Sequence, residues 1–142
     1  MENKMADERW TRWNPCGIPS GQYTVSKITQ NFEGVSIILD DEMCEVEMLF
    51  DGVPEIVCSS TANIRMKTWS EIQIKNNDRS YFRYHFLYKV KNSRLMQWLC
   101  DEGCGFYEKG SLQHYCIVTG TEVIDVVAGF EPIVSLRHMK NL

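Results

Sequence analysis

The chain is organised around the stretch Tyr81-Phe82-Arg83-Tyr84-His85-Phe86-Leu87-Tyr88-Lys89-Val90. Apolar side chains in it would share one face of an extended backbone, at Phe82, Tyr84, Phe86, Tyr88 and Val90. Alternation with a period of two is typical of a strand that covers a core with one face only. The stretch therefore predicts one long amphipathic strand from Tyr81 to Val90.

A helix is expected directly after this strand. Asn92 and Ser93 offer capping side chains, and Leu95, Trp98 and Leu99 have the three-to-four spacing of a buried helical stripe. Glycines at 103 and 105 are typical of a helix end. This pattern predicts one main helix near residues 93–102.

The rest of the chain reads mostly as short strands. They are expected at residues 23–30, 35–39, 44–50, 53–58, 112–118, 122–127 and 133–136, with less regular alternation at 64–69 and 71–75. Asp51-Gly52 predicts a tight hairpin between two of them, Gly120 marks a second hairpin, and Pro54 favours an edge position. The predicted fold class is α+β. We expect a mostly antiparallel sheet of eight or nine short strands, sandwich-like or strongly bent, with one main helix.

The length of the chain indicates a single domain. A chain of 142 residues fits a single domain, 1–142. Repeated Pro and Gly predict an irregular lead-in over residues 1–22, and the polar tail 137–142 is expected to fray. Trp10 and Trp13 are expected to clamp the lead-in onto the body; an exposed ligand platform is the alternative.

Composition favours a soluble, cytoplasmic protein. The first residues contain no apolar run of a secretory signal, and no apolar segment approaches the length needed to cross a bilayer. The six cysteines are therefore interpreted as free thiols in a reducing compartment rather than as three disulfides.

Charge is segregated along the chain, although the net charge is only −4. Residues 31–60 contain eight acidic side chains and no Lys or Arg, whereas residues 65–94 contain eight basic side chains and two acidic ones. Oppositely charged strands lying side by side would neutralise each other. The functional alternative is an acidic surface that faces a basic partner. The side chains proposed for that surface are Asp40, Asp41, Glu42, Glu45 and Glu47.

Candidate chemistry is sparse. Cys100, Cys104, His114 and Cys116 could supply four zinc ligands, but their spacing is not that of paired zinc motifs, so core and turn positions are favoured and no metal or other cofactor is expected. A cysteine nucleophile would need a nearby histidine, and Cys16 in its loop could pair with one of His85, His114 and His138. Any chain with six cysteines and three histidines permits such a dyad, so this interpretation is disfavoured.

Asp125 lies within the apolar run Val123-Ile124-Asp125-Val126-Val127. A carboxylate there must face solvent or be satisfied by hydrogen bonds. Pairing with His114 across the hairpin could serve acid–base chemistry, although a structural buried hydrogen bond or an exposed strand position is the favoured interpretation.

Two further classes of ligand are disfavoured. Gly103-Cys104-Gly105 does not follow a strand and open a helix, as a phosphate-binding loop must. The basic, aromatic stretch 79–94 suggests single-stranded nucleic acid, but its rings alternate with its cations on opposite faces and the protein is acidic overall.

The second half of the chain resembles a group of small bacterial proteins, some of them of immunity-protein type. The residues that carry the resemblance lie within 81–136: Phe86 to Ser93, Trp98, Leu99, Gly105, His114, Tyr115, Thr119, Ile124, Asp125, Val126 and Pro132. Most are core-type residues, so the resemblance implies a fold and no catalytic residue.

We therefore expect a small non-catalytic cytoplasmic protein-binding domain. The resemblance implies an immunity-type protein that neutralises a toxin by occlusion, and the acidic residues suit a basic toxin domain. The alternative is a metal- or cysteine-dependent enzyme built on Cys100, Cys104, His114 and Cys116. A homodimer formed through a sheet edge is the third option, and neither membrane nor nucleic acid is an expected partner.

Overall fold

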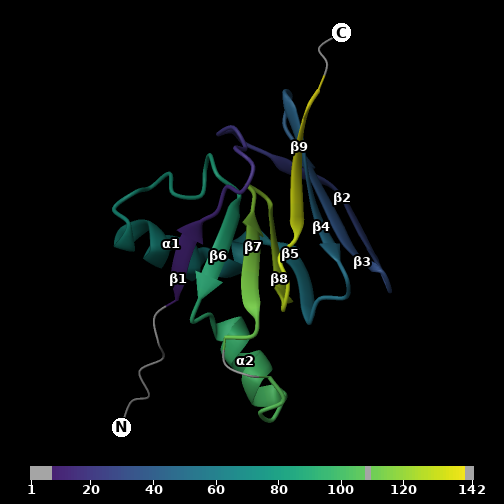
Figure 1. The fold of residues 1–142 in the computed structure, drawn as a ribbon. Helices are drawn as coiled ribbons and strands as arrows, with labels where there is room; N and C mark the ends of the chain where they lie inside the picture. Colours follow the sequence, from purple (N-terminus) through teal and green to yellow (C-terminus); the bar gives the residue numbers. More distant parts are fainter. Residues whose placement is uncertain (1–7, 108–109, 140–142) are drawn as a thin grey trace.

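The computed structural model describes residues 8–107 and 110–139. Nine strands of the described residues form two antiparallel sheets (Figure 1). The five-stranded sheet has the order β1 (Arg9–Arg12), β6 (Leu87–Lys91), β7 (Gln113–Val118), β8 (Glu122–Ala128) and β5 (Ile56–Thr61). The four-stranded sheet has the order β2 (Thr24–Asn31), β3 (Gly34–Asp40), β4 (Cys44–Asp51) and β9 (Ile133–His138). The predicted α+β, sandwich-like class is confirmed.

The main core lies between the two sheets. Along β3 and β4 every second side chain is buried, as period-two alternation requires. These side chains pack against the inward-facing residues of β6, β7 and β8, which include Leu87, Tyr115 and Ile124.

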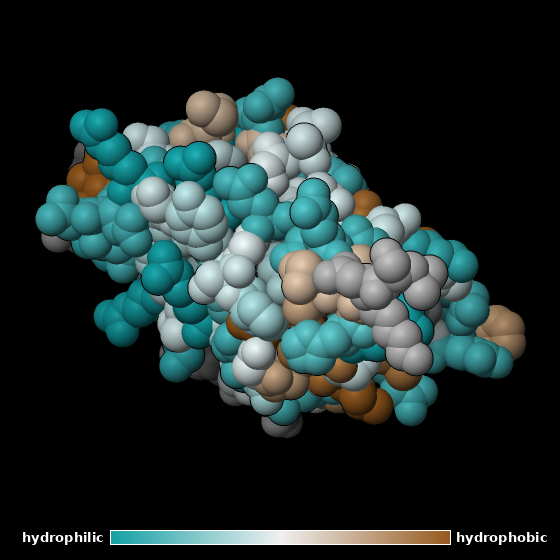
Figure 2. All heavy atoms as spheres, turned by 90° about the horizontal axis from the view of Figure 1, so that it is seen from above, coloured by the Kyte–Doolittle hydropathy of each residue, from teal (hydrophilic) through white to brown (hydrophobic). Residues whose placement is uncertain are grey.

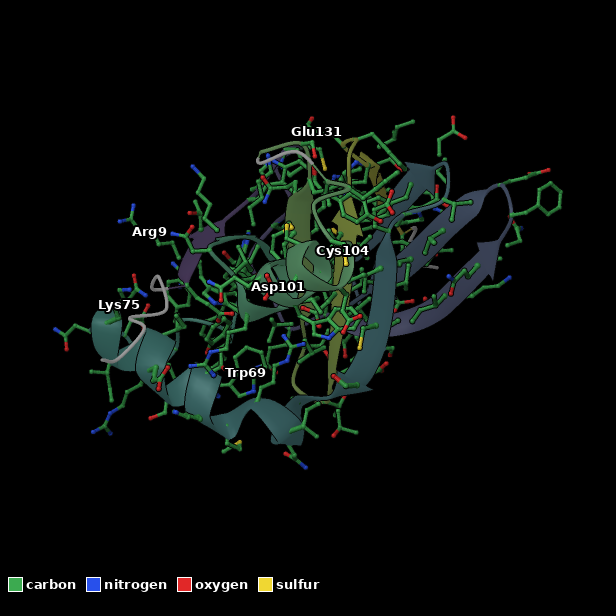
Figure 3. The ribbon with its side chains drawn as sticks, turned by 90° about the horizontal axis from the view of Figure 1, so that it is seen from below. Arg9, Trp69, Lys75, Asp101, Cys104 and Glu131 are labelled. Atoms are coloured by element: carbon green, nitrogen blue, oxygen red, sulfur yellow. The ribbon has the colours of Figure 1, made fainter. Side chains whose placement is uncertain are left out.

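A second core covers the outer face of the five-stranded sheet. Trp69 and Ile72 of helix α1 (Met66–Lys75) pack there with Trp10, Tyr88 and other residues of β1, β6, β7 and β8. Figure 3 shows α1, which carries Trp69 and ends at Lys75, on the side of the molecule away from the four-stranded sheet. Helix α2 (Arg94–Glu102) lies beyond one end of the five-stranded sheet (Figure 1).

Several predicted elements are confirmed. The Ser93 hydroxyl accepts a hydrogen bond from the Met96 amide at 3.0 Å and so caps α2, which ends at Gly103. β7 and β8 form the hairpin predicted around Gly120, and β5 is an edge strand, as Pro54 indicated.

The long strand predicted over Tyr81–Val90 is wrong in its first half. Only Leu87 and the residues after it form β6, whereas residues 81–84 form a turn and a bend. The Tyr88 hydroxyl donates to the carbonyls of Tyr81 and His85 at 2.9 and 2.8 Å, and the Tyr81 hydroxyl donates to the Trp10 carbonyl at 3.1 Å. These hydrogen bonds hold Tyr81 and Phe82 in the core on the outer face of the five-stranded sheet.

The hairpin predicted at Asp51-Gly52 is also wrong. β4 pairs with β3 and β9, while β5 pairs with β8 in the other sheet. The Asp51-Gly52 segment therefore connects the two sheets, because the strands that flank it belong to different layers.

Residues 64–75 are helical, although they alternate like strands in the sequence. The 3-10 helix η1 (Ala62–Arg65) leads directly into α1. Trp69 and Ile72, which are three residues apart, are the buried residues of α1. Their spacing suits one helical face and would place them on opposite faces of a strand.

The predicted ends of the chain need correction as well. The lead-in contains strand β1, which the Pro and Gly residues of this region concealed, and Trp10 of that strand is buried as expected. At the other end β9 extends to His138, and the rest of the expected frayed tail beyond residue 139 lies outside the described residues. None of the helices in residues 8–107 and 110–139 has the length and apolarity that a bilayer span requires.

Candidate functional site

The β7–β8 hairpin brings three chemically active side chains together. Cys116 lies directly opposite Asp125 in the register, and His114 lies two residues away on the same face. All three are buried on the outer face of the five-stranded sheet. The sequence suggested a His114–Asp125 pair only as an alternative, and the structure brings these two side chains together.

Arg65 completes this cluster from η1. His114 Nε2 lies 2.7 Å from Asp125 Oδ1, and Arg65 Nη1 donates to the same oxygen at 3.1 Å. Arg65 Nη2 donates to Asp125 Oδ2. The sequence did not single out Arg65, because it lies 60 residues from its partner and no local pattern marks it.

The electrostatics of the cluster favour an ionised Asp125. Burial alone would raise the pKa of Asp125, but hydrogen bonds from His114 and Arg65 outweigh burial and lower it. The carboxylate is then an acceptor only, so His114 Nε2 donates to it. The pKa of Arg65 is raised, because the attraction of Asp125 exceeds the effect of burial. Burial raises the pKa of the Cys116 thiol well above its usual value, which keeps the thiol neutral.

His114, Cys116 and Asp125 could hold a metal ion, since their donor atoms all lie within 4.8 Å of one another. However, both carboxylate oxygens already accept hydrogen bonds, and the Asp125–Arg65 pair is neutral as it stands. A divalent cation with a Cys116 thiolate would leave a net positive charge in a buried site, which is costly. The cluster fits an ion pair that anchors η1 to the sheet better than it fits a metal centre.

The zinc set that the sequence suggested is not assembled as such. His114 and Cys116 are neighbours on β7, but Cys100 on α2 and Cys104 beyond it do not belong to the three-donor cluster found among the described residues. Cys104 is exposed and lies where α2 has ended, with Asp101 of α2 nearby in Figure 3.

One thiol lies beside a histidine, in a pair that no local sequence pattern marks. Cys44 Sγ lies 3.6 Å from His138 Nδ1, because the two residues are opposite each other on β4 and β9. Cys44 is only 3% exposed, which closes its sulfur to a substrate. Cys16, suggested as a nucleophile, is half-buried against the main core, and burial raises its pKa. Cys16 therefore lacks the lowered pKa of a reactive cysteine near a cation.

The acidic residues singled out from the sequence gather at one end of the four-stranded sheet. Asp40 ends β3, Asp41 and Glu42 form the turn that follows, and Glu45 and Glu47 point outward from β4. The turn lies at the top of Figure 1, and Figure 2, which looks onto that end of the molecule, shows a mostly hydrophilic surface with small apolar patches. Asp40, Asp41, Glu42 and Met43 also line a hollow of about 570 Å³.

The outer face of the four-stranded sheet is not covered by any described helix. We call this surface the open face; it consists of Ser36, Ile38 and Asp40 on β3, Glu45, Glu47 and Leu49 on β4, Lys27 and Thr29 on β2, and Ile133, Ser135 and Arg137 on β9. Both described helices lie on the side of the other sheet (Figures 1 and 3). A sheet with one bare face normally presents polar side chains to water. The open face also exposes apolar groups, with Ile133 at 59% exposure.

The carboxylates of the open face differ in their partners. Arg137 donates to Glu45 at 2.5 Å, and the Ser36 hydroxyl donates to Glu47 at 2.9 Å. Asp41 accepts from the amides of Met43 and Cys44 at 2.8 and 2.7 Å, so it shapes the β3–β4 turn.

The basic segment 65–94 does not lie beside these acidic strands, so it does not neutralise them as side-by-side strands would. Within the described part of the chain, Arg137 of β9 neutralises Glu45 alone among their carboxylates. The strands that border β3 and β4 are β2 and β9, whereas the basic segment lies in α1 and in the five-stranded sheet. Ion pairs of Arg65, Lys67 and Lys89 are made with Asp125, Glu71 and Glu131, none of which lies on β3 or β4.

Comparison with protein families, with characterised proteins and with solved structures found no match for this chain.

Proposed function

We propose that this chain is a small cytoplasmic protein-binding domain without catalytic activity, of the immunity type, which neutralises a basic partner by occlusion. The observation that carries the proposal is the open face together with the adjoining β3–β4 turn, which gather five carboxylates at one end of the sheet. A toxin domain rich in Lys and Arg is the kind of partner that such a surface suits.

Electrostatics support a basic partner over a neutral one. The net charge of the chain is −4, and the acidic end of the sheet is not paired with the basic segment. Complementary charge steers encounter and raises association rates, whereas like charge disfavours wrong partners. Apolar groups beside the carboxylates add the desolvated contact area that most protein interfaces need.

The experiment is affinity capture from cells of the source organism with the full chain, followed by identification of the bound protein. The variant carries Asp40→Lys and Glu47→Lys; Asp41 is left unchanged because it shapes the turn. The matched control carries Glu33→Lys and Glu102→Lys, two exposed carboxylates elsewhere on the chain. We expect a basic protein to be captured by the wild type and the control and lost from the variant. Equal capture by all three would refute the proposed surface.

An enzyme built on Cys100, Cys104, His114 and Cys116 remains the competing proposal. Elemental analysis of the purified protein separates the two. We expect less than stoichiometric zinc, because Cys100 and Cys104 do not belong to the donor cluster that contains His114 and Cys116. The third donor of that cluster, Asp125, is already bound by Arg65. One zinc per chain would favour the enzyme.

A further inference from the structure

Resting on the proposed function, we infer that the partner binds the open face with a segment that carries a Lys or Arg next to an apolar side chain. The cationic group lies between Asp40 and Glu45, and the apolar group packs on Ile38, Leu49 and Ile133.

The cationic position follows from the strand register. Asp40 and Glu45 lie directly opposite each other on β3 and β4, with both side chains on the open face. Like charges directly opposite in a sheet are unfavourable. Arg137, opposite Glu45 on the other side, pairs with Glu45, whereas Asp40 has Thr24 opposite it on β2. The acidic excess around Asp40 is the feature that a cation from a partner would relieve.

The site proposed for the apolar side chain is formed by the next two sets of cross-strand neighbours on the open face. Ile38 lies opposite Glu47, and Leu49 lies opposite Ile133 on β9. Ile38 and Leu49 are half-buried within the sheet, while Ile133 is exposed. An apolar side chain placed here would be adjacent to the carboxylates, so one short segment can reach both positions.

Charge also argues against a second copy of this chain as the occupant. The open face and its turn present five carboxylates (Asp40, Asp41, Glu42, Glu45 and Glu47) against two cations (Lys27 and Arg137). Two such faces placed together would bring like charges into contact, which is costly at an interface. A basic segment from another protein matches the face instead.

The test uses three synthetic peptide probes of equal length: repeats of Leu-Arg, of Gly-Arg and of Leu-Glu. Each is titrated into the full chain, and amide chemical shifts are followed by nuclear magnetic resonance. The variants are Asp40→Asn and Glu45→Gln, and the matched control is Glu33→Gln at the opposite end of the same sheet. Solution mass is measured for each protein.

We expect the Leu-Arg peptide to shift amides of β3, β4 and β9 in a saturable way, and more strongly than the Gly-Arg peptide. Each variant should weaken this binding by about threefold or more, which is modest because the site is exposed to solvent. Glu33→Gln should leave it unchanged, and the Leu-Glu peptide should not bind. Because Asp40→Asn also removes a like-charge contact, we expect it to raise the Tm of the free chain by roughly 1–3 °C.

Three results would overturn the inference: no saturable shifts on the open face, an equal loss with Glu33→Gln, or a dimer that buries β3 and β4. The same experiments distinguish failure of this inference from failure of the proposed function. If the peptides do not bind but the chain captures a basic protein through the open face, the function stands and this inference fails. If the peptides bind as expected but no protein is captured from cells, the inference stands without the proposed function.

Discussion

His114 and Asp125 form a buried hydrogen bond across the β7–β8 hairpin, with 2.7 Å between Nε2 and Oδ1. Asp125 is fully buried and His114 is 2% exposed. A carboxylate in such a place needs further compensation, and Arg65 supplies it from an element 60 residues earlier in the chain. The cluster of His114, Asp125 and Arg65 therefore anchors η1, and α1 that follows it, to the five-stranded sheet.

Replacing Arg65 should destabilise the fold strongly. Arg65→Met keeps most of the side-chain volume but removes the cation, leaving Asp125 with His114 as its partner. Breaking one side of a buried ion pair costs about 3–5 kcal/mol. Urea unfolding would measure this loss in the free energy of unfolding. The matched control is Arg83→Met, because Arg83 is exposed over the Tyr84 ring and should contribute little.

A double variant separates the contribution of the ion pair to stability from the contribution of side-chain packing. Asp125→Leu combined with Arg65→Met removes both charges, so part of the lost stability should return. If the two losses simply added, the ion pair would not be the reason for the cost.

Stability should fall on the acid side because of Asp125. Its pKa in the folded state is lowered below the value of about 3.9 for an unfolded Asp, since His114 and Arg65 outweigh the opposing effect of burial. The group therefore contributes stability that is fully present above about pH 4 and is lost as the pH falls through the folded pKa. Midpoints of urea unfolding, measured from neutral pH down to about pH 2.5, would show this loss of stability. Asp125→Asn should be less stable at neutral pH and should show a shallower acid decline; an equally steep decline would contradict the assignment.

The sequence predicted those elements whose periodicity is sustained. β3 and β4 alternate over their whole length, and the β7–β8 hairpin follows from two apolar runs around Gly120. The need of Asp125 for a partner could also be predicted, because a carboxylate in an apolar run must be compensated.

Long-range pairings are what the sequence concealed. Residues 81–86 alternate like a strand, but the first four of them form a turn and a bend, held by the hydrogen bonds of Tyr81 and Tyr88 and by ring contacts. Asp51-Gly52 has hairpin chemistry, yet each flanking strand finds a better partner in a different sheet. Tertiary contacts of this kind override local preference. The open face could not be predicted from apolar periodicity or from charge segregation, because neither pattern shows which strands are left uncovered by a helix.

A methyl group at Gly34 should be costly at the β2–β3 turn. Gly34 has φ +149°, and a Cβ atom there would lie 2.0 Å from the Phe50 carbonyl oxygen. Gly34→Ala must therefore move backbone on β4, and we expect a loss of more than about 1 kcal/mol in the free energy of unfolding. Gly120→Ala is the control, because nothing lies within 4 Å of its added Cβ. Thermal unfolding of the two variants would show equal midpoints if the close approach to Phe50 were unimportant.

The cysteines should differ in their reactivity according to burial. Cys58 and Cys104 are exposed, Cys16 and Cys100 are half-buried, and Cys44 and Cys116 are buried. Thiolate is the reactive form, and burial raises the pKa of Cys116 well above the usual value, so its thiol is both hidden and protonated. Timed alkylation of the folded protein with iodoacetamide, read by peptide mass spectrometry, should therefore label Cys58 and Cys104 first and Cys116 last. In urea all six should react at similar rates, which provides the control. Early labelling of Cys116 in the folded state would mean that η1 and α1 open readily from the sheet, and that the ion pair of Arg65 with Asp125 does not hold them in place.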